Sequence, residues 1–242
     1  MTGHRDNDFT NDTEIINLYG NCSTSLGNYP APQGIYQANG VFMNDSVIVC
    51  GGFMIGDDSV SSNDCYKLFK RDKFFRFFAK MQERRKMASI TVIQGNLWIT
   101  GGKSASYVLK STEFLPPKNT NSMSTSVQKI DLPEPLYGHV VINLNETTSF
   151  LIGGATTEAH ESSKSTYYFN HASNSWTEGP DLFQARRSHT VGIIKDNGNG
   201  KEHIAVVGGL SGYINVISIE LMFSGENVWS NGTVISTITN SF

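Results

Sequence analysis

The chain has 242 residues, of which 38% are hydrophobic and 17% are charged, and its formal net charge at pH 7 is −3. This length can bury a substantial core without requiring two domains. The small negative charge gives no general attraction for nucleic acid or for an anionic membrane, and no apolar run reaches the roughly 18 residues of a membrane span. We therefore expect neither nucleic acid nor membrane as a partner.

The N-terminal segment, residues 1–12, is polar and is expected to be disordered. It lacks the basic start and apolar core of a secretory signal, which favours a cytoplasmic location. An extracellular location is expected instead if the chain is an N-terminally truncated fragment. Residues 13–33 follow, and their strand-like start Thr13-Glu14-Ile15 is repeated in kind at Thr112-Glu113-Phe114 and Ile219-Glu220-Leu221. Residues 13–33 thus resemble the outer half of a repeated unit.

The main signal is an apolar run that ends on two glycines and occurs four times. The intervals between the first glycines of successive pairs are 50, 52 and 55 residues. A short apolar run rich in β-branched residues is typical of a strand buried on both faces, and paired glycines allow a turn that a β-carbon would block. The pattern predicts four repeated units at about 34–80, 81–132, 133–182 and 183–232, with a tail at 233–242. The glycine pairs are Gly51-Gly52, Gly101-Gly102, Gly153-Gly154 and Gly208-Gly209.

Aromatic residues recur after the glycine pairs. Tyr66 and Tyr167 are expected on third strands, and Trp176 and Trp229 on fourth strands. Large flat side chains there would fill the space between neighbouring sheets, so we interpret them as core. The only segment that could form a helix is 78–87, where a loop rich in Lys and Arg is at least as well supported.

The glycine pairs and the aromatic residues that follow them resemble kelch repeats, and the resemblance covers about 13–235. The resemblance implies an all-β fold, a kelch-type β-propeller of four-stranded antiparallel blades with four full blades and a partial one. Kelch propellers usually have five to seven blades, so the resemblance also implies an incomplete or open ring. Unpaired strand edges in an open ring invite self-association.

Function in such a propeller is expected on the face that carries the loops between second and third strands and between blades. Arginine pairs on this face could grip carboxylates of a partner, or could be solvated or paired with nearby acids. The predicted partner-binding residues are Arg84, Arg85, Arg186, Arg187, Asp57, Asp58, His160 and Tyr213.

Catalytic and metal motifs are not recognisable in the sequence. His139 and His189 occupy equivalent positions in two units, which favours a structural role, and no histidine or cysteine spacing matches a metal site. We expect no metal, no cofactor and no catalytic residue. Three cysteines occur, and Cys50 and Cys65 could face each other across an antiparallel pair and form a disulfide. The alternative is that all three are small buried apolar side chains.

The leading functional interpretation is a non-catalytic module that binds a partner protein or peptide, in a substrate-recognition or scaffold role. Kelch relatives imply two alternatives. One is a propeller enzyme similar to galactose oxidase or to sialic-acid epimerases. The other is a secreted kelch adhesion protein.

Overall fold

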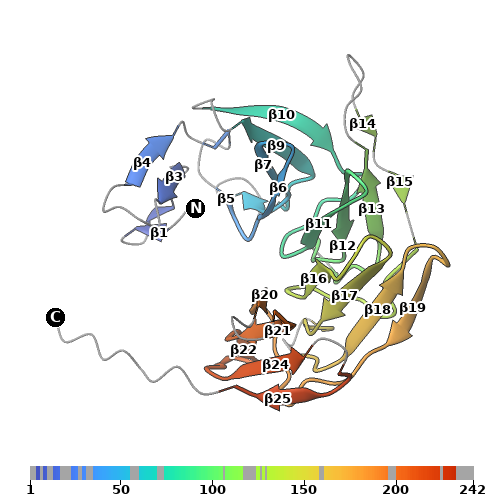
Figure 1. Ribbon diagram of the computed structural model, residues 1–242. Coiled ribbons are helices and arrows are strands. Elements are labelled where there is room, and N and C mark those ends of the chain that lie inside the picture. The colour runs from blue at the N-terminus through green and yellow to red at the C-terminus, as the bar shows by residue number, and fades with distance from the viewer. Residues whose placement is uncertain are drawn as a thin grey trace. The chain divides into compact units, whose positions relative to one another are not determined.

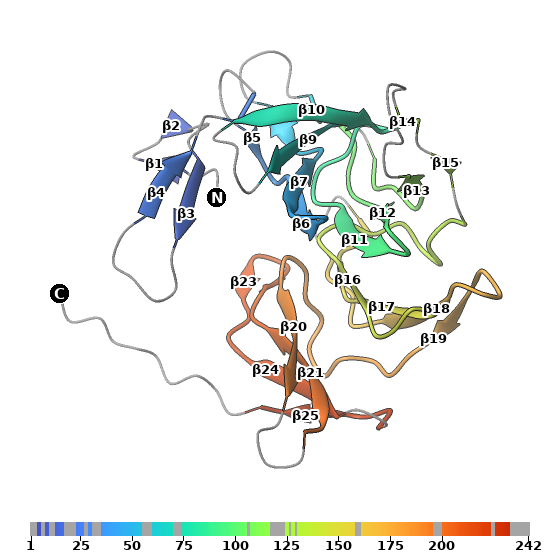
Figure 2. The same ribbon diagram turned by 45° about the horizontal axis from the view of Figure 1, so that its top comes forward.

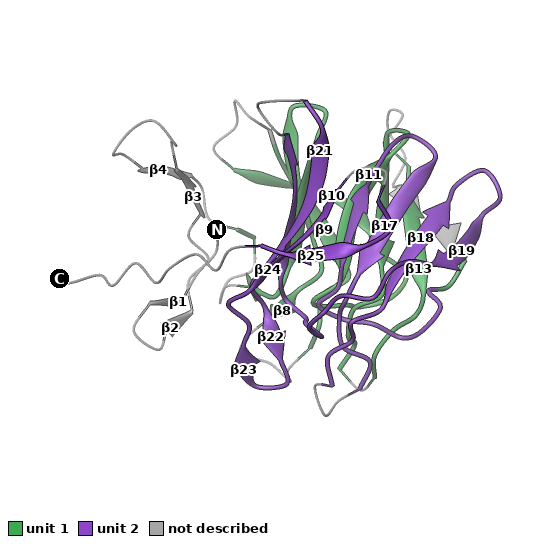
Figure 3. Cartoon of the chain, turned by 60° about the horizontal axis from the view of Figure 1, so that its bottom comes forward, with its two compact units in different colours: residues 1–131 green, residues 132–242 purple. Residues whose placement is uncertain are grey.

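The computed structural model describes residues 4–5, 8–9, 13–16, 23–26, 29–30, 35–54, 60–69, 74–105, 107–116, 124–125, 127–128, 130–157, 161–195, 200–223 and 226–232. The chain divides into two compact units, Met1–Asp131 and Leu132–Phe242, which Figure 3 shows in different colours. Every described element is a β-strand. No helix among the described residues is long and apolar enough to cross a membrane.

Unit 1 contains two large sheets, labelled in Figure 1. The first has the order β14-β10-β9-β7-β6, in which β14 lies parallel to β10 and all other pairs are antiparallel. The second is antiparallel, with the order β11-β12-β13-β15. The strands are β6 (Asn39–Met43), β7 (Ser46–Cys50), β9 (Asp64–Phe69), β10 (Phe75–Lys80), β14 (Ser124–Thr125), β11 (Ser89–Ile93), β12 (Asn96–Thr100), β13 (Thr112–Leu115) and β15 (Val127–Gln128).

Unit 2 contains two further four-stranded antiparallel sheets. Their orders are β16-β17-β18-β19 and β20-β21-β24-β25, and Figure 2 shows the second from another side. The strands are β16 (Val140–Asn143), β17 (Thr148–Ile152), β18 (Thr166–Asn170), β19 (Ser175–Glu178), β20 (Thr190–Lys195), β21 (Glu202–Val207), β24 (Ile219–Phe223) and β25 (Trp229–Asn231).

Short two-stranded pairs complete the described structure. They are β1 (His4–Arg5) with β2 (Asp8–Phe9), β3 (Thr13–Ile16) with β4 (Ser23–Leu26), β5 (Ile35–Tyr36) with β8 (Phe53–Met54), and β22 (Leu210–Ser211) with β23 (Ile214–Asn215). Within residues 1–12 the structure describes residues 4–5 and 8–9, which form the β1–β2 pair, and the other residues of the segment lie outside the described part. Within 78–87, strand β10 runs to Lys80 and the remaining residues carry no helix.

The core of each unit lies between its two large sheets. In unit 1, Ile48 of β7 belongs to the same buried cluster as Leu97 and Ile99 of β12. In unit 2, Phe150 of β17 belongs to a cluster with Val206 of β21. Strands β12 and β17 are buried along nearly their whole length, as the apolar runs before the glycine pairs predict. In β7, by contrast, Val47 is 39% exposed.

The predicted aromatic positions differ in burial. Trp229 is buried, stacks near Phe150 and donates its indole N–H to the Pro180 carbonyl at 2.8 Å. Trp176, by contrast, is only partly buried and packs against Phe169 of its own sheet. Tyr66 and Tyr167 are also partly buried, so only Trp229 has the burial expected of a core residue.

All eight glycines of the pairs have positive φ, between 53° and 114°. They let the preceding strand turn sharply where another backbone segment approaches. The N–H of Gly52 donates to the Arg85 carbonyl at 2.9 Å, and a β-carbon on Gly51 would lie 2.3 Å from the same oxygen. In unit 2, Gly154 donates to the Arg186 carbonyl in the same way, at 2.8 Å. The glycine pairs are therefore required both for the turn and for the close approach.

Cys50 and Cys65 face each other in register on β7 and β9 and are joined by a disulfide. Their Cα atoms are 4.1 Å apart, and both residues are buried. Of the two sequence interpretations, the structure has the disulfide for this pair.

Candidate functional site

The loops at the glycine end of the sheets are held together by backbone pairing. In unit 1, Lys86 of the segment before β11 pairs with Lys103, which in turn pairs with Val108. In unit 2, Arg187 of the segment before β20 pairs with Leu210 in the same manner. Segments that precede a sheet and loops that follow its second strand therefore form one continuous surface in each unit, which we call the loop face of that unit.

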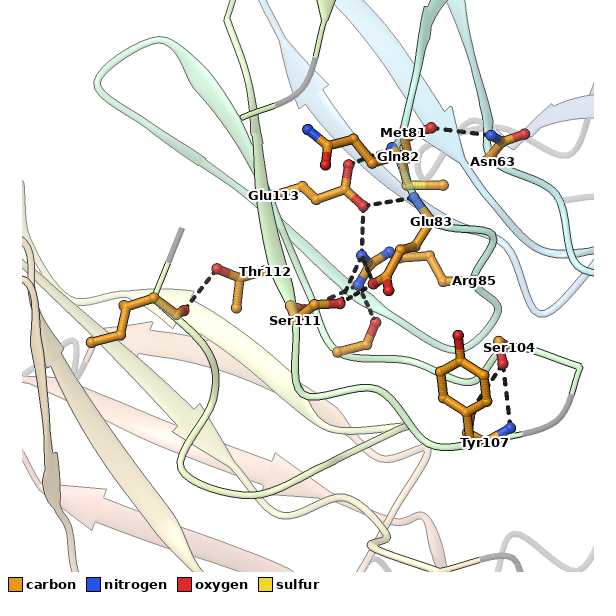
Figure 4. Close-up of polar contacts among 12 residues, drawn as sticks. Asn63, Met81, Gln82, Glu83, Arg85, Ser104, Tyr107, Ser111, Thr112 and Glu113 are labelled. Atoms are coloured by element: carbon orange, nitrogen blue, oxygen red, sulfur yellow. Dashed lines mark hydrogen bonds and ion pairs between the residues drawn. The ribbon is translucent and has the colours of Figure 1, made fainter. Parts of the chain in front are cut away.

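Beneath the loop face of unit 1 lies a buried ion pair, shown in Figure 4. The Arg85 guanidinium donates to Oε1 of Glu113 at 2.6 Å, and to the carbonyls of Gly101 and Ser111 at 2.7 and 3.1 Å. Glu113 also accepts from the backbone N–H groups of Gln82 and Glu83, at 2.7 and 3.1 Å. We call this arrangement the Arg85–Glu113 clamp. It fixes the segment between two sheets of unit 1 to the third strand of the second sheet.

Unit 2 contains a second copy, the Arg186–Glu220 clamp. Arg186 donates to Oε1 of Glu220 at 2.5 Å, and to the carbonyls of Gly208 and Ser218 at 3.0 and 3.1 Å. Two backbone N–H groups of the preceding segment again donate to the carboxylate, those of Phe183 and Gln184. The two clamps use equivalent groups: a glutamate on the third strand of the sheet and the carbonyl of the first glycine of the pair.

This placement corrects the predicted docking role of Arg85 and Arg186. Both side chains are 0% exposed, so neither guanidinium can contact a partner in the folded chain. The alternative given for these arginines, pairing with acidic residues of the same chain, is correct for both Arg85 and Arg186. The reason is that each guanidinium donates to carbonyls at the glycine turn as well as to its carboxylate partner, so its hydrogen bonds are made inside the fold.

Arg187 and Arg84 differ from these two. Arg187 is also buried, lies over the Tyr137 ring at 6.0 Å and donates to the Gly212 carbonyl at 2.8 Å, so its docking role is corrected as well. Arg84 is exposed and donates to the Ser61 carbonyl at 3.2 Å. Of the four predicted arginines, Arg84 alone presents its side chain on the loop face.

Tyr213 lies at the tip of the β22–β23 hairpin and is 81% exposed. The hairpin beneath it is fixed by the bond from Arg187 to Gly212 and by Ser162, whose hydroxyl donates to the Leu210 carbonyl at 3.0 Å. Its neighbour Ile214 is 73% exposed. The equivalent loop of unit 1 presents Tyr107, which is 57% exposed. The loop faces therefore carry aromatic side chains on constrained loops.

The other predicted residues have no part in this arrangement. Asp57, Asp58 and His160 lie outside the described residues. His139 and His189 are buried, directly before the innermost strands β16 and β20. Burial, followed by the nearby Arg186 charge, lowers the pKa of His189 to about 4. A histidine that stays neutral and packs against Gly209 has the structural role that its repeat position indicates.

Sequence reasoning missed several features of this face. Tyr107 and Ile214 carry no motif, since their exposure depends on loop conformation. The partners of Arg85 and Arg186 did leave a signal, because Glu113 and Glu220 each stand twelve residues after the first glycine of a pair. Within the described part of the chain, no group of three or more His, Cys, Asp or Glu side chains could hold a metal ion.

Comparison with known proteins gives a fold and no family. No family model and no curated protein matches the chain. A solved structure of YjhT, a kelch-like propeller, is similar, with a TM-score of 0.75 and 13% sequence identity over 95% of this chain and 85% of that one. At this identity the likeness shows the fold alone. The chain is thus an all-β protein whose several four-stranded antiparallel sheets are consistent with the blades of a propeller.

Proposed function

We propose that the chain is a non-catalytic kelch-type module that binds a partner protein or peptide through its loop faces. The observation that carries this proposal is the exposure of Tyr213 and Ile214 on a hairpin whose backbone is already fixed. Tyrosine is enriched at the centres of protein interfaces, because it offers a large contact area with few rotatable bonds. A fixed hairpin also loses little entropy on binding.

The charged part of the proposed face is smaller than the sequence suggests. In the segment before β11 of unit 1, Arg85 is buried, Arg84 is exposed and Lys86 is partly exposed. The Lys86 ammonium lies 4.2 Å from the Phe53 ring centroid. We therefore expect apolar and aromatic contacts to supply most of the affinity. Charge at Arg84 would adjust association rates and salt dependence.

The test is affinity capture with the intact chain beside Tyr213→Asp/Ile214→Asp. Captured proteins that depend on the loop face should be lost with this variant, and its melting temperature should stay close to that of the wild type. The matched control is Val228→Asp, because Val228 is 65% exposed, directly precedes β25 and lies outside the hairpin. Equal capture by all three chains would overturn the proposal.

A second candidate, a secreted kelch adhesion protein, is favoured by the Cys50–Cys65 disulfide. Stable disulfides are common in extracellular proteins and rare in reducing compartments. The measurement is the mass of the protein from its native source after alkylation without reduction. An intact bridge supports secretion, whereas two alkylated thiols argue for a reducing compartment.

A further inference from the structure

A cavity of about 570 Å³ lies between the two large sheets of unit 2. Its walls come from β18, β20, β21 and β24 and from the turns beside them. This volume falls within the range of small-molecule sites, about 300–1,000 Å³. The loop-face residues of unit 2, Tyr213 and Ile214, do not line the cavity, so it is a separate feature of the unit.

Aromatic side chains of the cavity are held in place by contacts within the unit. Tyr168 stacks on Phe150 with ring centroids 4.4 Å apart, and its hydroxyl donates to Oδ1 of Asn227 at 3.1 Å. Phe223 packs edge-to-face against His203 at 4.4 Å. Tyr168, Phe223 and His203 all line the cavity. Because these rings are fixed before any ligand enters, binding costs little reorganisation.

The charge of the lining is negative. Glu202 and Glu226 line the cavity, and no lysine or arginine does. Lys195 neutralises Glu202 at 3.0 Å, but among the described residues no basic side chain pairs with Glu226.

We propose that this cavity binds a small organic cation, an ammonium group carried on an apolar or aromatic body. The apolar walls would hold the body, and the faces of aromatic rings attract a cation. Glu226 would supply the opposite charge. An anionic ligand would face an unneutralised carboxylate instead.

Isothermal titration calorimetry on the full chain tests the charge preference directly. Three probes of similar size are compared at low ionic strength, namely 2-phenylethylammonium, 2-phenylethanol and phenylacetate. The ammonium probe should bind at least about tenfold more tightly than the alcohol, and phenylacetate should bind most weakly. Equal affinity for the three probes, or no binding of the ammonium probe, would overturn the proposal.

Two variants place the binding in this cavity. Glu226→Gln should lower the affinity for the ammonium probe to near that for the alcohol and leave the alcohol's affinity unchanged. The control is Glu161→Gln, an exposed carboxylate of the same unit that does not line the cavity and should bind all probes as the wild type does. Unchanged ammonium binding by Glu226→Gln, or an equal loss with Glu161→Gln, would mean that the cation binds elsewhere and would refute the site. Melting temperatures confirm that both variants are folded.

Discussion

Nη2 of Arg186 lies 2.5 Å from Oε1 of Glu220, and both side chains are shielded from solvent. At the corresponding positions of the preceding sheet stand Leu136 and Tyr167, with the Tyr167 hydroxyl 3.3 Å from Glu134. The same site in the same unit is thus filled once by an ion pair and once by an apolar residue with a tyrosine.

This difference between two equivalent positions predicts that a second mutation can restore stability lost at Arg186. Arg186→Leu alone should lower the free energy of unfolding by about 3–5 kcal/mol, because it leaves the Glu220 carboxylate buried without its cation. Arg186→Leu/Glu220→Tyr should recover most of that loss, since it copies the Leu136 and Tyr167 arrangement. Urea unfolding of the wild type, both single variants and the double variant gives the coupling energy.

An exposed ion pair is the control for this cycle. Lys164 and Asp181 lie 2.9 Å apart with both side chains about half exposed. Lys164→Ala should cost less than about 1 kcal/mol. Additive losses for Arg186→Leu and Glu220→Tyr would contradict the rescue.

His189 should make stability depend on pH below neutrality. Its pKa is lowered from 6.5 to about 4 by burial, so between these values the unfolded chain binds a proton that the folded chain does not. The free energy of unfolding should therefore fall as pH decreases through this window, by up to about 1.4 kcal/mol per pH unit, and should lose this dependence above pH 6.5. Denaturant unfolding at several pH values measures the slope.

The comparison for this slope is His189→Gln, which removes the titrating group and keeps a polar side chain of moderate size. Its stability should vary less with pH between about 4 and 6.5 than that of the wild type. An identical slope in both proteins would assign the acid sensitivity to other groups.

Substitutions of glycine should differ sharply by position. Gly209 has φ of 102°, and a β-carbon there would lie 2.7 Å from the Arg187 carbonyl oxygen, so Gly209→Ala combines backbone strain with a steric clash. Gly200 has φ of 68° but open space around it, and Gly192 has neither constraint. Thermal melting should rank the alanine variants in that order of loss, with Gly192→Ala close to wild type. A Gly200→Ala variant less stable than Gly209→Ala would contradict the close approach.

Loss of the disulfide should destabilise unit 1. Cys50 and Cys65 are 15 residues apart in sequence, and closing a loop of that length is worth about 3 kcal/mol in the chain-entropy description. Cys50→Ala/Cys65→Ala should therefore unfold at lower denaturant concentration than the oxidised wild type. Since both sulfurs are buried, reduction of the folded protein should be slow in the absence of denaturant. Equal midpoints for the variant and the oxidised wild type would mean that the bridge adds no stability.

The repeated strands could be predicted from sequence because they depend on local pattern. An apolar run such as 97–99 predicts a buried strand, and the Gly101-Gly102 pair after it predicts the turn. The docking face could not be predicted to the same degree, because exposure is set by tertiary contacts. Arg85 and Arg84 are adjacent in sequence, yet one points into a ring of buried acceptors and the other lies on the surface. Only the position of Glu113 and Glu220 in the repeat distinguishes the two fates.

The difference between the Arg186–Glu220 pair and the equivalent Leu136 and Tyr167 positions also bears on how the chain avoids misfolding. Repeated sheets of similar shape can exchange neighbours while they assemble. If the segment carrying Arg186 docked on the strand of Tyr167, a guanidinium would be enclosed without its carboxylate, and Glu220 would lose its cation at the same time. Such an error would leave two buried charges without partners. The residue type in each linking segment therefore favours docking on the correct sheet.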